Sequence, residues 1–131
     1  MKKLISYFII VITVTICSCK KQAGEGGSST IKGTINIEEW NSTFTIHDVT
    51  KDRLGADVDV YIVYGDDITY GNKLKSSPDG IFEFKYLRKG VYTVYAYSKD
   101  PSPDGKVAVK IKAEITGKKQ TVDAGMLTIK D

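Results

Sequence analysis

Residues 76–94 have the sequence SSPDGIFEFKYLRKGVYTV, and this stretch decides the fold class. Apolar and polar residues alternate on both sides of the turn at 88–90, which is the period of a β-strand with one buried face. Asp79-Gly80 supplies the positive φ of a tight hairpin turn. The stretch therefore predicts two adjacent strands, whose inward residues are Phe82, Phe84 and Tyr86 in the first and Tyr92, Val94 and Ala96 in the second.

Two residues near this turn have predicted structural roles. Gly90 relieves a sharp corner between the two strands, where a positive φ favours glycine. Tyr92 follows it, and we expect its ring to be buried and its hydroxyl to bond back to nearby backbone, as in a tyrosine corner.

The order of these residues resembles the signature of the carboxypeptidase regulatory-like, or prealbumin-like (transthyretin-like), β-sandwich domains. That signature is an Asp-Gly turn, an aromatic strand and the pattern L-x-x-G-x-Y, and residues 31–35 and 56–64 are similar to the family's first two strands. The resemblance implies an accessory module for binding, spacing or stabilising, although a fold alone does not imply a function. The residues that carry it are Asp79, Gly80, Leu87, Gly90 and Tyr92.

The same alternation recurs from residue 30 to the C-terminus. Its further inward residues are Ile31, Gly33, Ile35 and Ile37; Val58, Val60, Ile62 and Tyr64; and Val107, Val109, Ile111, Ala113 and Ile115. A weaker strand fits 69–75, and a last one runs over about 121–129, where a bulge at Gly125 turns Leu127 and Ile129 inward. Because each run has one apolar and one polar face, we predict an all-β fold, a seven-stranded antiparallel β-sandwich with an Ig-like Greek key. Residues 39–56 fit either a long loop or an inserted hairpin around 44–46.

The N-terminus has the pattern of a bacterial lipoprotein signal peptide. A basic start precedes an apolar run over 4–16, which is shorter than the roughly twenty residues of a membrane-spanning helix. The run ends in Ile16-Cys17-Ser18-Cys19, which resembles a lipobox, so we expect cleavage before Cys19 and lipidation of its sulfur. An ordinary signal peptide with a coincidental cysteine and an uncleaved anchor are the alternatives.

These patterns predict three segments. Residues 1–18 are the signal peptide, 19–29 the lipidated cysteine with a flexible Gly/Ser tether, and 30–131 the β-sandwich. Because two or three acyl chains anchor a protein stably, membrane lipid is the expected partner of Cys19. The expected location is the cell envelope, in the outer membrane of a Gram-negative bacterium.

Charge and cysteine positions exclude several classes of function. The net charge of +3 comes from residues 1–29, where four lysines face one glutamate; the totals of 19 basic and 16 acidic residues leave 15 of each for 30–131. A neutral domain lacks the basic footprint of nucleic-acid binding. Both cysteines lie in the first twenty residues, so the domain has no disulfide and no thiolate.

No catalytic motif is present in the sequence. His47 is the only histidine, and we interpret it as a surface or loop residue rather than a ligand. Asp66-Asp67 and the pair Asp100 and Asp104 lack the spacing of a calcium loop, so turn formation explains them better. We therefore predict no catalytic residue, no metal site and no cofactor.

Outward-facing tyrosines are the best candidate ligand surface. If Tyr92, Val94 and Ala96 face inward, Tyr95 and Tyr97 face outward, and Tyr61 similarly opposes the inward face of its strand. Outward tyrosines anchor sugars and proteins because each offers a flat apolar face with a polar tip; alternatively they cover a sheet edge, pack against the Trp40 loop or pair across strands. The predicted function is a non-enzymatic accessory or binding module of the cell envelope, with a glycan or an envelope protein as partner. The alternatives are an adhesin-like structural spacer and a carbohydrate-active or other envelope enzyme.

Overall fold

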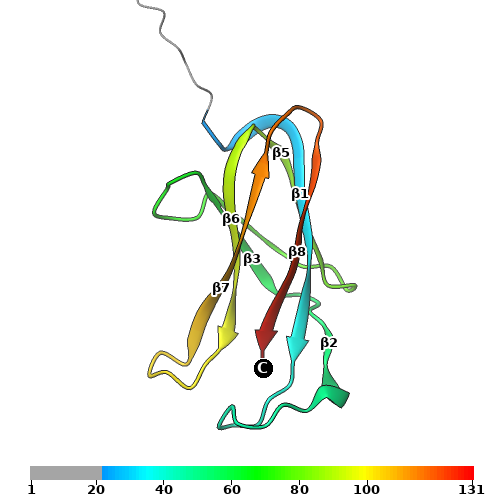
Figure 1. Cartoon of the computed structure of the whole chain (residues 1–131), viewed down its shortest axis with the longest axis vertical. Helices are drawn as coiled ribbons and strands as arrows, with labels where there is room; N and C mark the ends of the chain where they lie inside the picture. Colours follow the sequence, from blue (N-terminus) through cyan, green and yellow to red (C-terminus); the bar gives the residue numbers. More distant parts are fainter. Residues whose placement is uncertain (1–21) are drawn as a thin grey trace, which may run out of the picture.

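A computed structural model describes residues 22–131, which form a two-sheet β-sandwich (Figure 1). The predicted signal peptide over 1–18 and the predicted lipidation site Cys19 lie outside the described residues. The elements are β1 (Glu25–Glu38), η1 (Val49–Lys51), β2 (Arg53–Leu54), β3 (Asp59–Tyr64), β4 (Asn72–Lys75), β5 (Ile81–Leu87), β6 (Gly90–Lys99), β7 (Lys106–Ile115) and β8 (Thr121–Lys130). In one sheet β1 pairs with β2, β5 and β8, and the other has the order β4-β3-β6-β7. The predicted all-β sandwich is confirmed, with β2 as an eighth strand.

One strand pair differs from the antiparallel arrangement that the sequence predicts. β1 and β8 run parallel, with Ile31 opposite Val122 and Ile37 opposite Ile129. The connection between β7 and β8 explains the direction, because β7 ends where β1 begins and the chain then crosses to the other sheet (Figure 1). Two parallel strands cannot be joined by a tight turn and need a long connection. Here that connection is the chain from β2 to β7, which lies between β1 and β8 in the sequence.

The core lies between the two sheets and consists of the residues that alternation predicts. Ile31, Ile35, Val60, Ile62, Tyr92, Val94 and Ala96 are fully buried. Gly125 has a φ of 94°, and the register between β1 and β8 shifts beside it, so the predicted bulge is confirmed and Leu127 and Ile129 face the core.

Two residues that alternation predicts to be buried are exposed: Val107, at the start of β7, is 46% exposed, and Tyr86 faces outward. Its side chain is 71% exposed, and Leu87 is buried in its place. The backbone at Tyr86 has a φ of 60°, and the pairing of β1 with β5 is irregular at this end. This local break in the pleat reverses the alternation, so the prediction that Tyr86 faces inward is wrong.

The two predicted corner residues have the expected geometry. The Tyr92 hydroxyl donates a hydrogen bond to the carbonyl of Arg88 and accepts one of 2.9 Å from the amide of Gly24. Gly90 has a φ of 152°, and Gly80 closes the Asp79-Gly80 turn with a φ of 71°. The amide of Gly80 donates to the carbonyl of Ser77, which closes the turn before β5.

The sandwich begins earlier in the chain than the sequence predicts. Residues 25–29, expected to belong to the flexible tether, are the first part of β1. Ser29 is buried, and its hydroxyl donates to the carbonyl of Gly117 and accepts from the amide of Gln120. The boundary of the folded domain therefore lies at Glu25 or before, rather than at residue 30.

Residues 39–56 form a compact loop with η1 and the short strand β2. An isolated bridge joins Trp40 to His47, and the amide of Asn41 donates to the carbonyl of Ile46. The segment therefore combines both predicted alternatives, a hairpin-like turn within a longer loop. Within residues 22–131, no helix has the length and hydropathy needed to span a bilayer.

Candidate functional site: an aromatic face of the second sheet

Four tyrosines gather on the outer face of the sheet β4-β3-β6-β7. Tyr61 comes from β3, Tyr95 and Tyr97 from β6, and Tyr70 from the segment before β4. The three residues that the sequence predicts as a ligand surface are thus brought together by the structure. We call these four residues the tyrosine cluster.

The rings of the tyrosine cluster contact one another across the strands. Tyr61 and Tyr95 are register partners whose rings stack with centroids 4.9 Å apart and planes 8° from parallel. Tyr97 meets both rings edge-on at 5.5 and 5.7 Å, and Tyr70 meets Tyr61 edge-on at 5.0 Å. Tyr70 and Tyr97 remain 46% and 41% exposed. The rings therefore pair across strands and also present a solvent-accessible surface.

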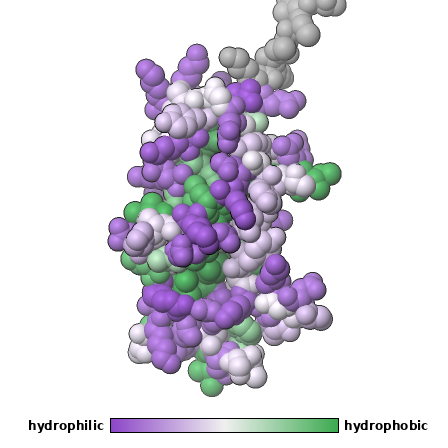
Figure 2. Space-filling model, turned by 180° about the vertical axis from the view of Figure 1, so that it is seen from behind, coloured by the Kyte–Doolittle hydropathy of each residue, from purple (hydrophilic) through white to green (hydrophobic). Residues whose placement is uncertain are grey.

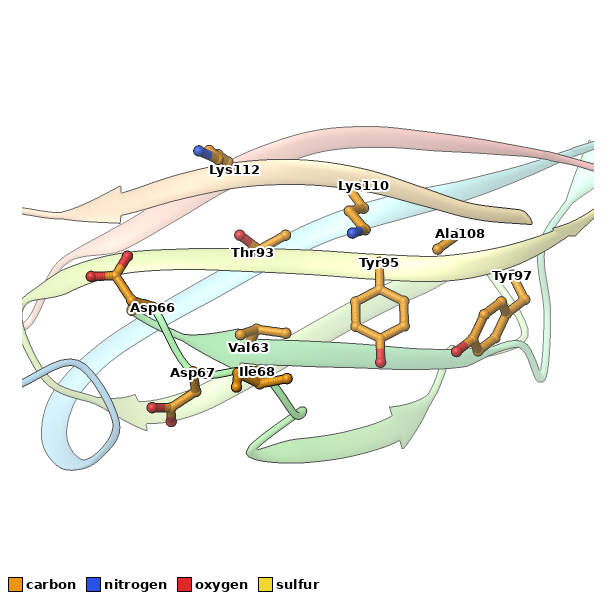
Figure 3. Close-up of a pocket in the computed structure, with 11 residues that line it drawn as sticks. Val63, Asp66, Asp67, Ile68, Thr93, Tyr95, Tyr97, Ala108, Lys110 and Lys112 are labelled. Atoms are coloured by element: carbon orange, nitrogen blue, oxygen red, sulfur yellow. The ribbon is translucent and has the colours of Figure 1, made fainter. Parts of the chain in front are cut away.

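A shallow hollow lies beside the cluster on the same sheet face (Figure 3). Its volume is about 600 Å³. Small side chains of the sheet line it, with Val63 and Thr93 in the middle and Ala108 next to its register partner Tyr97 (Figure 3). Tyr95 and Tyr97 lie at one end, and the loop with Asp66, Asp67 and Ile68 lies at the other, with Lys110 and Lys112 along the β7 side (Figure 3).

The loop that bounds the hollow carries an exposed apolar residue. This loop, between β3 and β4, projects from the side of the sandwich (Figure 1), and the reverse view shows a hydrophobic tip at that position (Figure 2). Ile68 in this loop is 99% exposed. An apolar side chain here adds to the contact area available at the rim of the hollow.

Lysines border the tyrosine cluster on both sides. The ammonium of Lys106 lies 4.5 Å from the ring centroid of Tyr97, and that of Lys73 lies 6.0 Å from that of Tyr61. These are cation–π distances, so each ammonium lies beside a ring face. Lys75 differs, because it forms an ion pair of 3.2 Å with Asp59.

The environment of Tyr95 disfavours ionisation of its phenol. Burial raises the pKa of Tyr95, and the neighbouring Tyr97, Tyr61 and Tyr70 raise it further. A neutral phenol can donate one hydrogen bond and also accept, whereas a phenolate can only accept. Tyr95 can therefore donate a hydrogen bond to a ligand hydroxyl or accept one from it.

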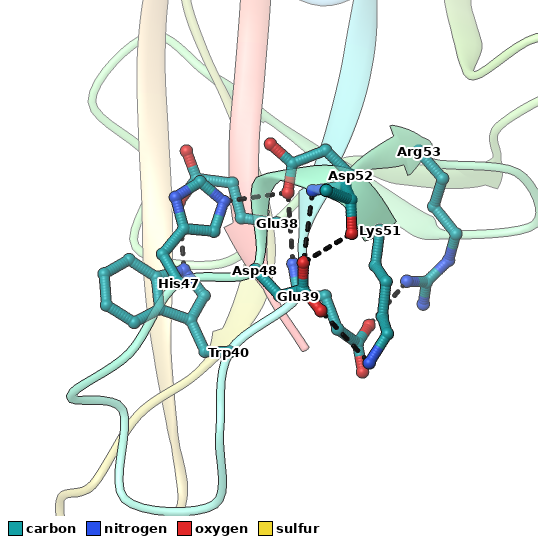
Figure 4. A network of polar contacts seen from close by, with 9 residues as sticks. Glu38, Glu39, Trp40, His47, Asp48, Lys51, Asp52 and Arg53 are labelled. Atoms are coloured by element: carbon teal, nitrogen blue, oxygen red, sulfur yellow. Dashed lines mark hydrogen bonds and ion pairs between the residues drawn. The ribbon is translucent and has the colours of Figure 1, made fainter.

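The single histidine belongs to a separate polar network within the loop 39–56 (Figure 4). His47 stacks on Trp40 with centroids 5.0 Å apart, and its Nε2 lies 2.8 Å from Asp52 Oδ1. Arg53 joins Glu39 to Asp131 through contacts of 2.7 and 2.6 Å. These groups satisfy one another, so we interpret the network as the structure that closes the loop.

The acidic pairs considered from the sequence lie in loops. Asp66 and Asp67 follow β3, and Asp100 lies in a turn where its amide donates to the carbonyl of Gly105. In the part of the chain from 22 to 131, no three Asp, Glu, His or Cys side chains are grouped closely enough to hold a metal ion.

Three residues of this surface were missed by sequence reasoning. Tyr70 falls in the strand predicted over 69–75, but β4 begins at Asn72, so Tyr70 lies in a loop where alternation does not fix the direction of its side chain. Lys73 and Lys106 are ordinary exposed strand lysines in the sequence, and only their ring contacts distinguish them. The sequence signal that locates them is the alternation of β4 and β7, which places them on the outer face without identifying their neighbours.

The fold and this surface define a small β-sandwich module with an exposed aromatic face. Neither a protein-family model nor a curated protein matches the chain. Among solved structures, it is similar to a Pseudomonas aeruginosa protein described as a "putative carbohydrate binding protein", with a TM-score of 0.45 and 10% identity over 83% of this chain and 92% of that one. A likeness at this score carries no argument about function, so the surface is interpreted from its own side chains.

Proposed function

We propose that this chain is a non-enzymatic, lipid-anchored binding module of the bacterial cell envelope, and that the tyrosine cluster with its adjacent hollow binds a glycan. The observation that carries the proposal is the gathering of Tyr61, Tyr70, Tyr95 and Tyr97 on one exposed sheet face. An aromatic ring contributes a large contact area and a polar tip, and it loses little conformational entropy on binding.

A glycan suits this combination of groups because a sugar ring has apolar C–H faces and a rim of hydroxyls. The tyrosine rings offer apolar area for the first, and Asp66, Asp67 and the neutral Tyr95 offer hydrogen-bond acceptors for the second. The mutual stacking of Tyr61 with Tyr95 holds the rings in place before a ligand arrives. Such preorganisation lowers the entropic cost of binding.

The sequence supports the proposed anchor, and the fold supports a short tether. The lipobox residues end at Cys19, and the chain is already bonded into the sandwich at Gly24. A fully extended chain from one to the other spans at most ~18 Å. We therefore expect an anchored domain to stay close to the lipid headgroups, in the outer membrane of a Gram-negative bacterium.

A glycan array tests the binding surface. The test uses the chain from residue 19 onward with Cys19→Ser, which keeps all eight strands and the whole core. We expect a glycan ligand whose binding falls at least about tenfold in Tyr95→Ala/Tyr97→Ala, since each lost aromatic contact costs on the order of 1 kcal/mol. Tyr86→Ala is the matched control, because this exposed tyrosine lies on β5 of the other sheet.

Thermal melts of each variant accompany the array. The tyrosines removed are outside the core, so the variants should stay folded. A glycan bound equally well by the wild type and by Tyr95→Ala/Tyr97→Ala would contradict the proposed surface.

A further inference from the structure

We infer that the tyrosine cluster takes an acidic polysaccharide, an inference that rests on the proposed glycan-binding function and adds the charge class of the ligand. Four register partners form one row across the second sheet. Lys73 of β4 is opposite Tyr61 of β3, Tyr61 is opposite Tyr95 of β6, and Tyr95 is opposite Lys110 of β7. Two stacked phenols are thus flanked by an ammonium group on each side.

The row has the length of a polymer segment rather than of a single ion. Adjacent strands are about 4.8 Å apart, so the backbones of Lys73 and Lys110 are separated by roughly 14 Å. Lys106 extends the positive border, because its ammonium lies over the ring of Tyr97 in the neighbouring position. A chain of several sugar rings that crosses the phenols can meet a lysine at either end.

The charges on this face are unevenly distributed. Asp59 is paired with Lys75. Asp66 and Asp67 lie with Lys112 at the end of the hollow that is far from the tyrosines. Glu114 lies further along β7. Across residues 22–131, no carboxylate forms an ion pair with Lys73, Lys106 or Lys110. The lysines next to the rings are therefore available to carboxylates or sulfates of a ligand.

The stacked pair of phenols in this row is closed to insertion of a ligand ring. Tyr61 and Tyr95 are 4.9 Å apart and nearly parallel, which leaves no space for a flat base to insert between them. Ring surface for C–H contacts with a sugar remains on the partly exposed Tyr70 and Tyr97. Exposed ammonium groups in turn attract anions in a manner that salt screens, so the two contributions can be separated experimentally.

Three polymers separate the contributions of rings and charge. Polygalacturonate has sugar rings and carboxylates, dextran has rings alone, and polyglutamate has carboxylates alone. With the Cys19→Ser chain from residue 19, we expect binding to polygalacturonate that weakens at least tenfold in Lys73→Glu/Lys110→Glu and also when salt rises from ~0.05 to ~0.5 M. Lys32→Glu/Lys85→Glu is the matched control, because it makes the same charge change at exposed positions of β1 and β5 in the other sheet.

Each other outcome overturns the inference in a recognisable way. Dextran could bind as tightly as polygalacturonate, with binding lost in Tyr95→Ala/Tyr97→Ala and unchanged in Lys73→Glu/Lys110→Glu. This result would support the proposed glycan binding and refute the inference that the ligand is acidic. Equal binding of polyglutamate or of oligothymidylate would show attraction to any polyanion and remove the glycan as well. Failure to bind polygalacturonate, alginate and chondroitin sulfate, with a neutral glycan found on the array, would likewise refute an acidic ligand.

Discussion

The Tyr92 hydroxyl accepts a 2.9 Å hydrogen bond from the backbone amide of Gly24, a residue 68 positions earlier in the chain. The same hydroxyl donates to the carbonyl of Arg88, four positions before it. One buried side chain thus fixes both the β5–β6 corner and the point where the N-terminal segment joins the sandwich. The contact therefore stabilises the fold, and it also leaves only the residues between Cys19 and Gly24 as chain that is not held by the Tyr92 hydroxyl.

Tyr92→Phe should lower the free energy of unfolding by about 2 kcal/mol, because two hydrogen bonds are lost and each has a net value of about 1 kcal/mol. The ring stays in the core, while the Gly24 amide and the Arg88 carbonyl lose their partner. Urea melts of the Cys19→Ser chain from residue 19 measure the change. Tyr86→Phe is the control, because this ring is 71% exposed, and equal midpoints for all three proteins would contradict the corner.

Gly90→Val should destabilise the domain by more than Tyr92→Phe. A β-branched residue resists positive φ, and a Cβ at position 90 would lie 2.6 Å from the Cβ of Ala23. Gly90→Ala in an Ala23→Gly background removes the Cβ–Cβ contact and retains both the backbone cost and the 3.0 Å approach to the Cα of residue 23, so its difference from Gly90→Ala alone measures the Cβ–Cβ contact. If Gly90→Val has the midpoint of the wild type in the same melts, neither cause operates.

Removal of residues 19–29 should destabilise the sandwich rather than merely shorten its tether. The truncation deletes the first residues of β1 and, with Ser29, the hydrogen bonds to Gly117 and Gln120. It also removes Gly24, the partner of Tyr92. Thermal denaturation of chains that begin at residues 19, 22 and 30 tests this: the first two should melt alike and the third at a lower temperature, whereas three identical curves would restore the tether interpretation.

Stability should fall as the pH rises from about 10 to about 12, in part through Tyr64. Burial and the nearby Glu25 raise the pKa of Tyr64 to about 12, while an unfolded tyrosine titrates near ~10. Between these values the unfolded state loses a proton that the folded state keeps, so unfolding becomes more favourable. Urea midpoints across this range should drop less steeply in Tyr64→Phe, and parallel pH curves for the two proteins would contradict the shift.

Cys19→Ala should abolish lipidation and release the protein from membranes. The reason is chemical, because the thioether to diacylglycerol needs the cysteine sulfur, and acylation of the new amino group follows cleavage at that residue. Metabolic labelling with a palmitate analogue and membrane sedimentation measure the outcome, with Cys17→Ala as the matched control that should still be labelled. A Cys19→Ala protein that labels and sediments like the wild type would disprove the anchor.

Much of the fold follows from local pattern. Alternation places Ile31, Val60 and Val94 inward, and all three are fully buried. The same rule places Tyr61, Tyr95 and Tyr97 outward, where the structure has them. Facing direction is predictable because successive side chains of a strand point to opposite faces whatever the strand pairs with. The rule fails at Tyr86, where a positive φ interrupts the pleat.

The sequence by itself determined most of the residues that face the core and the turns that separate the strands, because each depends on neighbours within a few positions. Only the tertiary structure decided that β1 and β8 run parallel and that Glu25–Ser29 belong to the sheet. It alone aligned Lys73, Tyr61, Tyr95 and Lys110 in one row. Strand register depends on contacts between segments far apart in the chain, and a shift of two residues would keep every facing direction while giving each side chain a different neighbour.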